Sequence, residues 1–151
     1  MSHWISGKLS LVCSLEQMRN ALVNIMPQWE RHIQVSEEGN LDINSSFAND
    51  TKGGFHIRVP ETSTPGVSYC DFGMKRLKDG SWHIEYDNGG LPKEMKKAPT
   101  VLKNQIGAMR MREISKQNGI DIIEENKIGS VIKQRIRMSV SQVNEFVQQI
   151  Q

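Results

Sequence analysis

Short runs in which apolar and polar residues alternate, joined by turn residues, fill the middle of this chain and constrain its fold most. Residues 55–59 alternate in this way and end at Pro60, as expected of a half-buried strand. Two more strands are predicted at about 67–77 and 81–87. Asp79-Gly80 joins them and can supply the positive φ that hairpin turns need. The pattern predicts antiparallel hairpins.

Three helical stretches interrupt these strands. Ser14 opens a Ser-x-x-Gln capping box, after which apolar residues recur at helical spacing until Pro27. A second helix is predicted to begin at Pro99 and to end at Asn118-Gly119, because proline favours the first helical position and glycine follows the last. A third helix is predicted to follow Ser139, which opens another Ser-x-x-Gln capping box with Gln142.

The remaining segments complete the predicted order of elements. We expect a strand at 4–13, a second at 29–35, mostly loop at 36–54 with a short strand near Leu41 and Ile43, and a last hairpin, 120–125 and 130–138, around 126–129. Hairpins interrupted by single helices predict the α+β class, with an antiparallel sheet built largely of hairpins and helices packed on one face. A doubly wound sheet is the weaker alternative.

Composition limits the class of protein. At 151 residues the chain suits one domain, 1–151, since single cores typically hold about 100 to 150 residues. With 37% hydrophobic and 24% charged residues it should pack a core. No apolar run could span a membrane, and the first residues lack the features of a signal peptide, so we expect a cytoplasmic protein. Cys13 and Cys70 are interpreted as buried, reduced thiols.

Signatures of catalysis and of cofactor binding were sought in the sequence. It contains no nucleophile elbow, phosphate-binding loop, His-Glu-x-x-His helix or paired-cysteine metal site, so no cofactor and no metal are expected. His32, His56 and His83 alternate with apolar residues on predicted strands. Zinc binding by these three is the weaker alternative to solvent-facing histidines, since no close pair of ligands accompanies them.

A basic cluster towards the C-terminus gives the candidate binding site. Lys133, Arg135 and Arg137 lie two apart on a predicted strand and should project from one face, while Arg110, Arg112 and Lys116 lie on the preceding helix. Guanidinium groups grip phosphates, so RNA, DNA or a nucleotide would suit such a patch. The alternative is an ordinary solvated face, partly neutralised by nearby glutamates, in a chain whose net charge is +2: Glu113, Glu124 and Glu125.

Two carboxylates near the glycine pair Gly89-Gly90 support a third hypothesis, that of an enzyme. Asp71 and Asp87, with Tyr86, could line a cleft beside this loop, and paired carboxylates can perform acid and base chemistry. Without known separation or burial, we interpret both as solubilising or turn residues. No residue is predicted to be catalytic.

Several short motifs resemble one family across nearly the whole chain. They are Met1-Ser2-His3-Trp4 before a strand and a Leu-rich helix, Asp71-Phe72-Gly73 leading into a hairpin, and Ala108 to Gly119 followed by Ile122-Ile123-Glu124-Glu125. They resemble the Ycf-type chloroplast reading-frame family, also found in cyanobacteria, other bacteria and phages and known as domain of unknown function twelve fifty-seven. The chain departs from that pattern in three places: Trp4 replaces the usual Phe, and 37–52 and the helix after Ser139 look like extensions.

The resemblance implies a type of partner protein but assigns no function to individual residues. The family has no established activity or catalytic residues, so it assigns no role to any side chain here. It implies a small accessory protein, in some bacteria encoded near an ATPase of the AAA type, and suits a divergent bacterial or phage member. We therefore expect a non-enzymatic accessory or adaptor protein with a protein partner. The alternative is a binder of nucleic acid or nucleotide through the basic cluster, and a homodimer is a further expectation because an edge strand offers a pairing surface.

Overall fold

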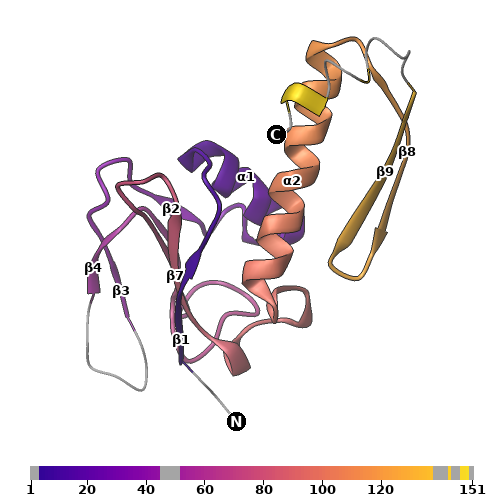
Figure 1. Ribbon diagram of the computed structural model, residues 1–151. Coiled ribbons are helices and arrows are strands. Elements are labelled where there is room, and N and C mark those ends of the chain that lie inside the picture. The colour runs from indigo at the N-terminus through magenta and orange to yellow at the C-terminus, as the bar shows by residue number, and fades with distance from the viewer. Residues whose placement is uncertain (1–3, 45–51, 138–142, 144–146, 150–151) are drawn as a thin grey trace. The chain divides into compact units, whose positions relative to one another are not determined.

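A computed structural model describes residues 4–44, 52–137, 143 and 147–149 of the chain (Figure 1). The chain divides into two compact units, Met1–Lys103 and Asn104–Gln151, and each is described by itself. The α+β class and the antiparallel sheet are confirmed. The prediction of a single domain stays a prediction.

The first unit is built on a five-stranded antiparallel sheet. Its strand order is β1-β7-β6-β5-β2, and the Leu77–Ser81 turn with Gly80 at φ +84° joins β6 to β7, as the Asp-Gly pair predicted. The strands, in sheet order, are β1 (Trp4–Leu9), β7 (Trp82–Asp87), β6 (Phe72–Arg76), β5 (Ile57–Val59) and β2 (Gln34–Val35).

One face of this sheet forms the main core, together with α1 (Leu15–Ile25). The Ser14 capping box is confirmed: its hydroxyl accepts from the Gln17 N–H, and the Gln17 side chain accepts from the Ser14 N–H. Apolar residues of β6 and β7 turn to this face, and the ring centroids of Phe72 and Tyr86 lie 5.9 Å apart. Trp82, Ile84 and Tyr86 of β7 are all buried, as are Glu85 and Asp87.

The strand predicted at 29–35 is wrong over most of its length. Pro27 starts a short 3₁₀ turn, η1 (Pro27–Trp29), and only Gln34–Val35 pairs as a strand. Trp29 is fully buried, lies 5.7 Å from the Phe72 ring, and donates its indole N–H to the Pro65 carbonyl at 3.2 Å. Core packing of this indole therefore overrides the strand pattern.

A small hairpin, β3 (Leu41–Ile43) and β4 (Lys52–Phe55), covers the opposite face of the sheet. Figure 1 shows it across the sheet from α1. It packs over Gly73, where an added Cβ would meet the Ile43 side chain at 2.0 Å. The single strand predicted at 55–59 is therefore two strands with a break at His56, which lets Phe55 and Ile57 be buried on opposite faces of the sheet.

The strand predicted at 67–77 begins later, at Phe72. Tyr69 has φ +72°, a left-handed conformation that a strand does not contain, and the Ser68 N–H bonds to the Gly90 carbonyl at 2.9 Å. Two short turns follow β7 and lead towards the next helix, η2 (Asn88–Gly90) and η3 (Lys93–Met95).

The helix α2 (Ala98–Gln117) runs continuously from the first unit into the second and ends before Gly119 at φ +66°, as predicted. The hairpin of β8 (Asp121–Ile128) and β9 (Val131–Arg137) follows it. The turn predicted at 126–129 is wrong, because the strand pairing continues to Ile128 and Val131 and leaves Gly129 and Ser130 as the turn. Of the predicted closing helix, Val143 and 147–149 are helical, and its other residues lie outside the described ones. No described helix is long and apolar enough to cross a membrane.

Candidate functional site

The three bases predicted on β9 lie on one exposed face of the hairpin. Lys133, Arg135 and Arg137 are exposed, while the residues between them are half-buried. This alternation is that of a strand with one side turned to solvent. The predicted placement at period two is therefore confirmed, whereas ligand binding by these side chains stays a prediction.

Acidic residues of β8 lie opposite two of these bases, and an amide lies opposite the third. Arg137 pairs in register with Asp121 and Arg135 with Glu124, and Arg135 Nε lies 3.5 Å from Glu124 Oε2. Both partners of that ion pair are largely exposed, so it contributes little. Lys133 lies opposite an amide, Asn126, beside a hollow of about 230 Å³. Within the described residues Lys133 and Arg137 make no ion pair, so their charges face solvent.

Arg112 is engaged inside the second unit and does not join the β9 bases. From α2 its Nε donates to Glu125 Oε2 at 2.9 Å, and a second bond joins its terminal nitrogen to Oε1. Gln134 Nε2 also donates to Glu125 Oε2, at 2.9 Å. The Arg112 hydrogen bond, followed by that of Gln134, lowers the pKa of Glu125 to about 2, and the pKa of Arg112 is raised in return. This pair ties the hairpin to α2.

The predicted patch is thus divided. Arg110 and Arg112 are two residues apart on α2 and therefore point to different sides of the helix. The charge is nevertheless unevenly distributed along the chain. Seven lysines and arginines against five acidic residues give 104–151 a net +2, whereas twelve of each sign cancel in 1–103. The β9 strand carries three of those seven bases and no acid.

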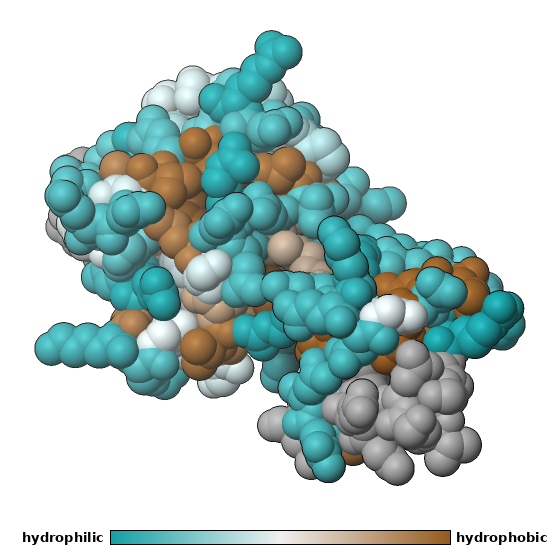
Figure 2. Space-filling model, turned by 90° about the horizontal axis from the view of Figure 1, so that it is seen from above, coloured by the Kyte–Doolittle hydropathy of each residue, from teal (hydrophilic) through white to brown (hydrophobic). Residues whose placement is uncertain are grey.

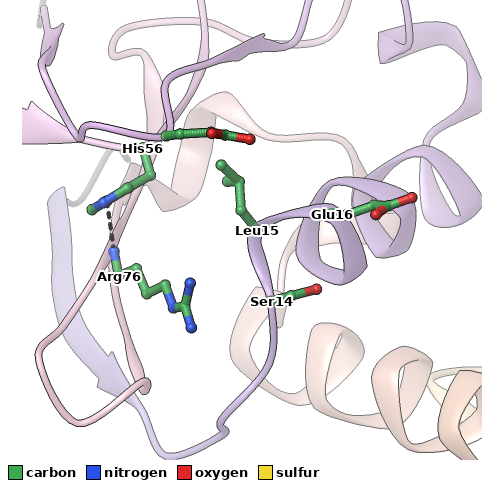
Figure 3. Close-up of a pocket in the computed structure, with 6 residues that line it drawn as sticks. Ser14, Leu15, Glu16, His56 and Arg76 are labelled. Atoms are coloured by element: carbon green, nitrogen blue, oxygen red, sulfur yellow. Dashed lines mark hydrogen bonds between the residues drawn. The ribbon is translucent and has the colours of Figure 1, made fainter.

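A second candidate is an open pocket of about 410 Å³ in the first unit, which was not predicted from the sequence (Figure 3). Ser14, Leu15 and Glu16 line it from the start of α1, facing His56 and Arg76 across the opening, and Glu37 completes the lining. No motif marks these residues, since they come from four separate segments. At the α1 N-terminus the capping box already uses the N–H groups of Ser14 and Gln17.

His56 is held in one tautomer at the edge of this pocket. Its Nδ1 accepts the backbone N–H of Arg76 at 3.0 Å, so a neutral ring carries its proton on Nε2. Burial, and then the charges of Arg76 and Lys75, lower the pKa of His56. Gly39, at φ +68°, packs on the ring, where an added Cβ would lie 2.7 Å from Nε2. The imidazole therefore supports the turn around Gly39 rather than facing solvent as predicted.

His83 belongs to a third polar cluster, with Ser6 and Glu85 on β1 and β7. Its Nε2 lies 3.1 Å from Glu85 Oε1 and 3.4 Å from the Ser6 hydroxyl. A Ser-His-acid relay needs the hydroxyl and the carboxylate on opposite ring nitrogens. Both lie at the same nitrogen here, so this arrangement does not activate the serine.

Asp71 and Asp87, the two carboxylates of the enzyme hypothesis, accept hydrogen bonds from backbone N–H groups. Asp71 is buried and accepts from the backbone N–H groups of Asn44 at 2.9 Å and Glu61 at 2.8 Å, and from Arg58 Nε at 2.7 Å. Asp87 is also buried, and its Oδ1 accepts from the N–H groups of Gly89 and Gly90 at 2.9 and 3.2 Å. Each side chain closes a loop.

The thiols and the remaining polar clusters give no metal site. Cys13 and Cys70 are buried thiols outside any disulfide, as predicted, and burial, followed by the charge of Asp71, raises the pKa of Cys70 to about 12. Among the described residues, no three His, Cys, Asp or Glu side chains gather closely enough to hold a metal ion.

Hydrophobic residues reach the surface beside hydrophilic ones, as Figure 2 shows for one face. In the second unit they include Ile128 and Val131 at the hairpin turn, 62% and 46% exposed, and Ile123, which is 47% exposed.

Comparisons of the chain with protein-family models, with curated proteins and with solved structures find no match.

Proposed function

We propose that this protein is a non-catalytic adaptor that binds another protein through the β8–β9 hairpin. One observation carries the proposal: no residue of β8 or β9 is buried, although the strands hold five isoleucines between them. A two-stranded hairpin alone is at best marginally stable in water, and it needs a third strand or a packed helix. Here α2 supplies only part of that cover, since Ile123 and Ile128 remain 47% and 62% exposed. A partner protein would cover the isoleucines of the hairpin that this chain leaves exposed.

The engagement of the carboxylates supports an adaptor over an enzyme. Asp71 accepts backbone N–H groups at both of its carboxylate oxygens and Asp87 accepts them at Oδ1, and the Ser6 cluster lacks the geometry of a relay. The family resemblance described above adds a partner class, an ATPase of the AAA type, and the sequence patterns described above add a cytoplasmic location. Both are part of the proposal.

Site-specific photocrosslinking tests this function. A photoreactive residue at Ile128 should join the protein to its partner in host cells, and the same residue at Val12, 56% exposed in the first unit, should not. The captured protein is then purified, and its dissociation constant is measured with the unmodified protein and with Ile128→Glu. We expect weaker binding to the variant. Equal crosslinking at both positions, or equal binding to both proteins, contradicts the proposal.

A second candidate function, the binding of a phosphate-bearing ligand, is favoured by the β9 bases. Lys133 and Arg137 face solvent, and Lys133 and Arg135 line the hollow of about 230 Å³. Single-stranded RNA should then bind with an affinity that falls by about 0.7 log units per log unit of salt for each phosphate contact. Lys133→Glu with Arg137→Glu should abolish this binding, and an unchanged affinity would exclude the candidate.

A further inference from the structure

The outer edge of β9 is open. Within the described residues β9 pairs with β8 alone, so the backbone N–H and C=O groups on its other side have no strand neighbour. Edge strands of this kind pair readily with an extended segment of another chain. Seven residues, Val131–Arg137, are long enough to template an added strand.

The side chains of β9 specify which segment would suit this edge. Lys133, Arg135 and Arg137 share one face, and Ile132, Gln134 and Ile136 share the other. In an added strand, residues directly opposite β9 would lie beside these side chains, and opposite charges there stabilise the pairing. Acidic residues at every second position, with apolar residues between them, match both faces.

We propose that β9 binds an acidic, extended segment of the partner protein, which joins β8–β9 as a third strand. This inference rests on the proposed adaptor function and names the chemistry of its partner. A second copy of this chain fits the edge less well, because antiparallel pairing of β9 with another β9 would bring bases together. An acidic strand instead meets the three bases and covers the isoleucines beside them.

Synthetic peptides test the proposal with the full-length protein. One peptide alternates glutamate with valine and threonine, and its isomer has the same composition with the glutamates in one block. Fluorescence anisotropy should show the alternating peptide binding about tenfold more tightly, because only it places an acid opposite each base. Equal binding would reduce the site to a nonspecific charged surface and overturn the proposal.

Backbone pairing is tested separately from charge. An alternating peptide N-methylated along its backbone keeps its charges but cannot donate hydrogen bonds, so its binding should be lost. On the protein, Lys133→Glu should weaken binding of the alternating peptide. Lys116→Glu makes the same charge change in the exposed last turn of α2 and should not. Retained binding of the methylated peptide, or equal effects of the two variants, contradicts strand addition.

The outcome separates this inference from the adaptor function. If crosslinking at Ile128 captures a partner while no acidic peptide binds, the adaptor function stands and strand addition fails. Single-stranded RNA can be added as a competitor of the bound peptide. If the RNA binds more tightly than the peptide does, β9 is a phosphate-binding surface and the inference is overturned.

Discussion

Two arginine–carboxylate pairs, one in each unit, have the same chemistry in different surroundings. Arg58 and Asp71 meet at 2.7 Å with side chains 22% and 1% exposed, and Asp71 also holds two backbone N–H groups. Arg112 and Glu125 form a two-bond pair with side chains 38% and 33% exposed. The first pair is built into a packed body, and the second supports a hairpin in water. The difference shows that similar ion pairs are enclosed in the first unit and partly exposed in the second.

The buried pair should give the largest effect. Asp71→Ala leaves two backbone N–H groups and a partly buried guanidinium without their acceptor, so we expect a loss of about 3 kcal/mol in the free energy of unfolding. Urea denaturation measures it. Glu125→Ala, the matched change in the exposed pair, should cost about 0.5 kcal/mol. If the two variants lost similar free energies of unfolding, the two ion pairs would not differ in their contribution to stability.

Replacing a glycine by alanine should destabilise the protein at Gly90 in the first unit and stabilise it at Gly107 in the second. In Gly90→Ala the new Cβ would lie 1.9 Å from the Ser68 carbonyl oxygen, so the backbone must move, at a cost of about 2 kcal/mol. Around Gly107, inside α2, nothing lies within 4 Å of an added Cβ. Gly107→Ala should therefore stabilise the protein by about 0.5 to 1 kcal/mol through helix propensity. Thermal unfolding of both variants measures the two signs, and a destabilising Gly107→Ala would contradict the open surroundings of this helix position.

The exposed pair should respond to acid. Because the pKa of Glu125 is lowered from 4.5 to about 2, its contribution to stability is complete above about pH 4.5 and is lost as the pH falls towards 2. An NMR titration of the Glu125 carboxyl carbon follows the pKa directly. Arg112→Ala should raise that pKa towards its ordinary value, since the largest cause of the shift is removed. The same midpoint in both proteins would show that Arg112 does not hold the carboxylate.

Local patterns predicted much of the fold. The capping box at Ser14, the Asp79-Gly80 turn and the alternation of β9 are each set by residues close in sequence, and all three were predicted correctly. The errors at Trp29 and Tyr69 arise from distant contacts, with Phe72 and with the Gly90 segment, which no local pattern contains.

The candidate site was predictable in part for the same reason. Period two placed the β9 bases on one exposed face, because a strand fixes the direction of its side chains. Arg112 lies on another element, and its bond to Glu125 depends on how the hairpin packs against α2. The pocket around His56 and Arg76 is likewise assembled from separate segments, so no local pattern marks Arg76 as a site residue.

Hydrogen exchange tests most directly the claim that the hairpin is an incomplete element awaiting a strand. In the free protein, amides of β8 and β9 should exchange well before those of β6 and β7, because local opening costs least where nothing is buried. Adding the alternating acidic peptide should slow exchange in β9 and leave β6 and β7 unchanged. If the hairpin amides of the free protein were as protected as those of β6 and β7, the account would be contradicted.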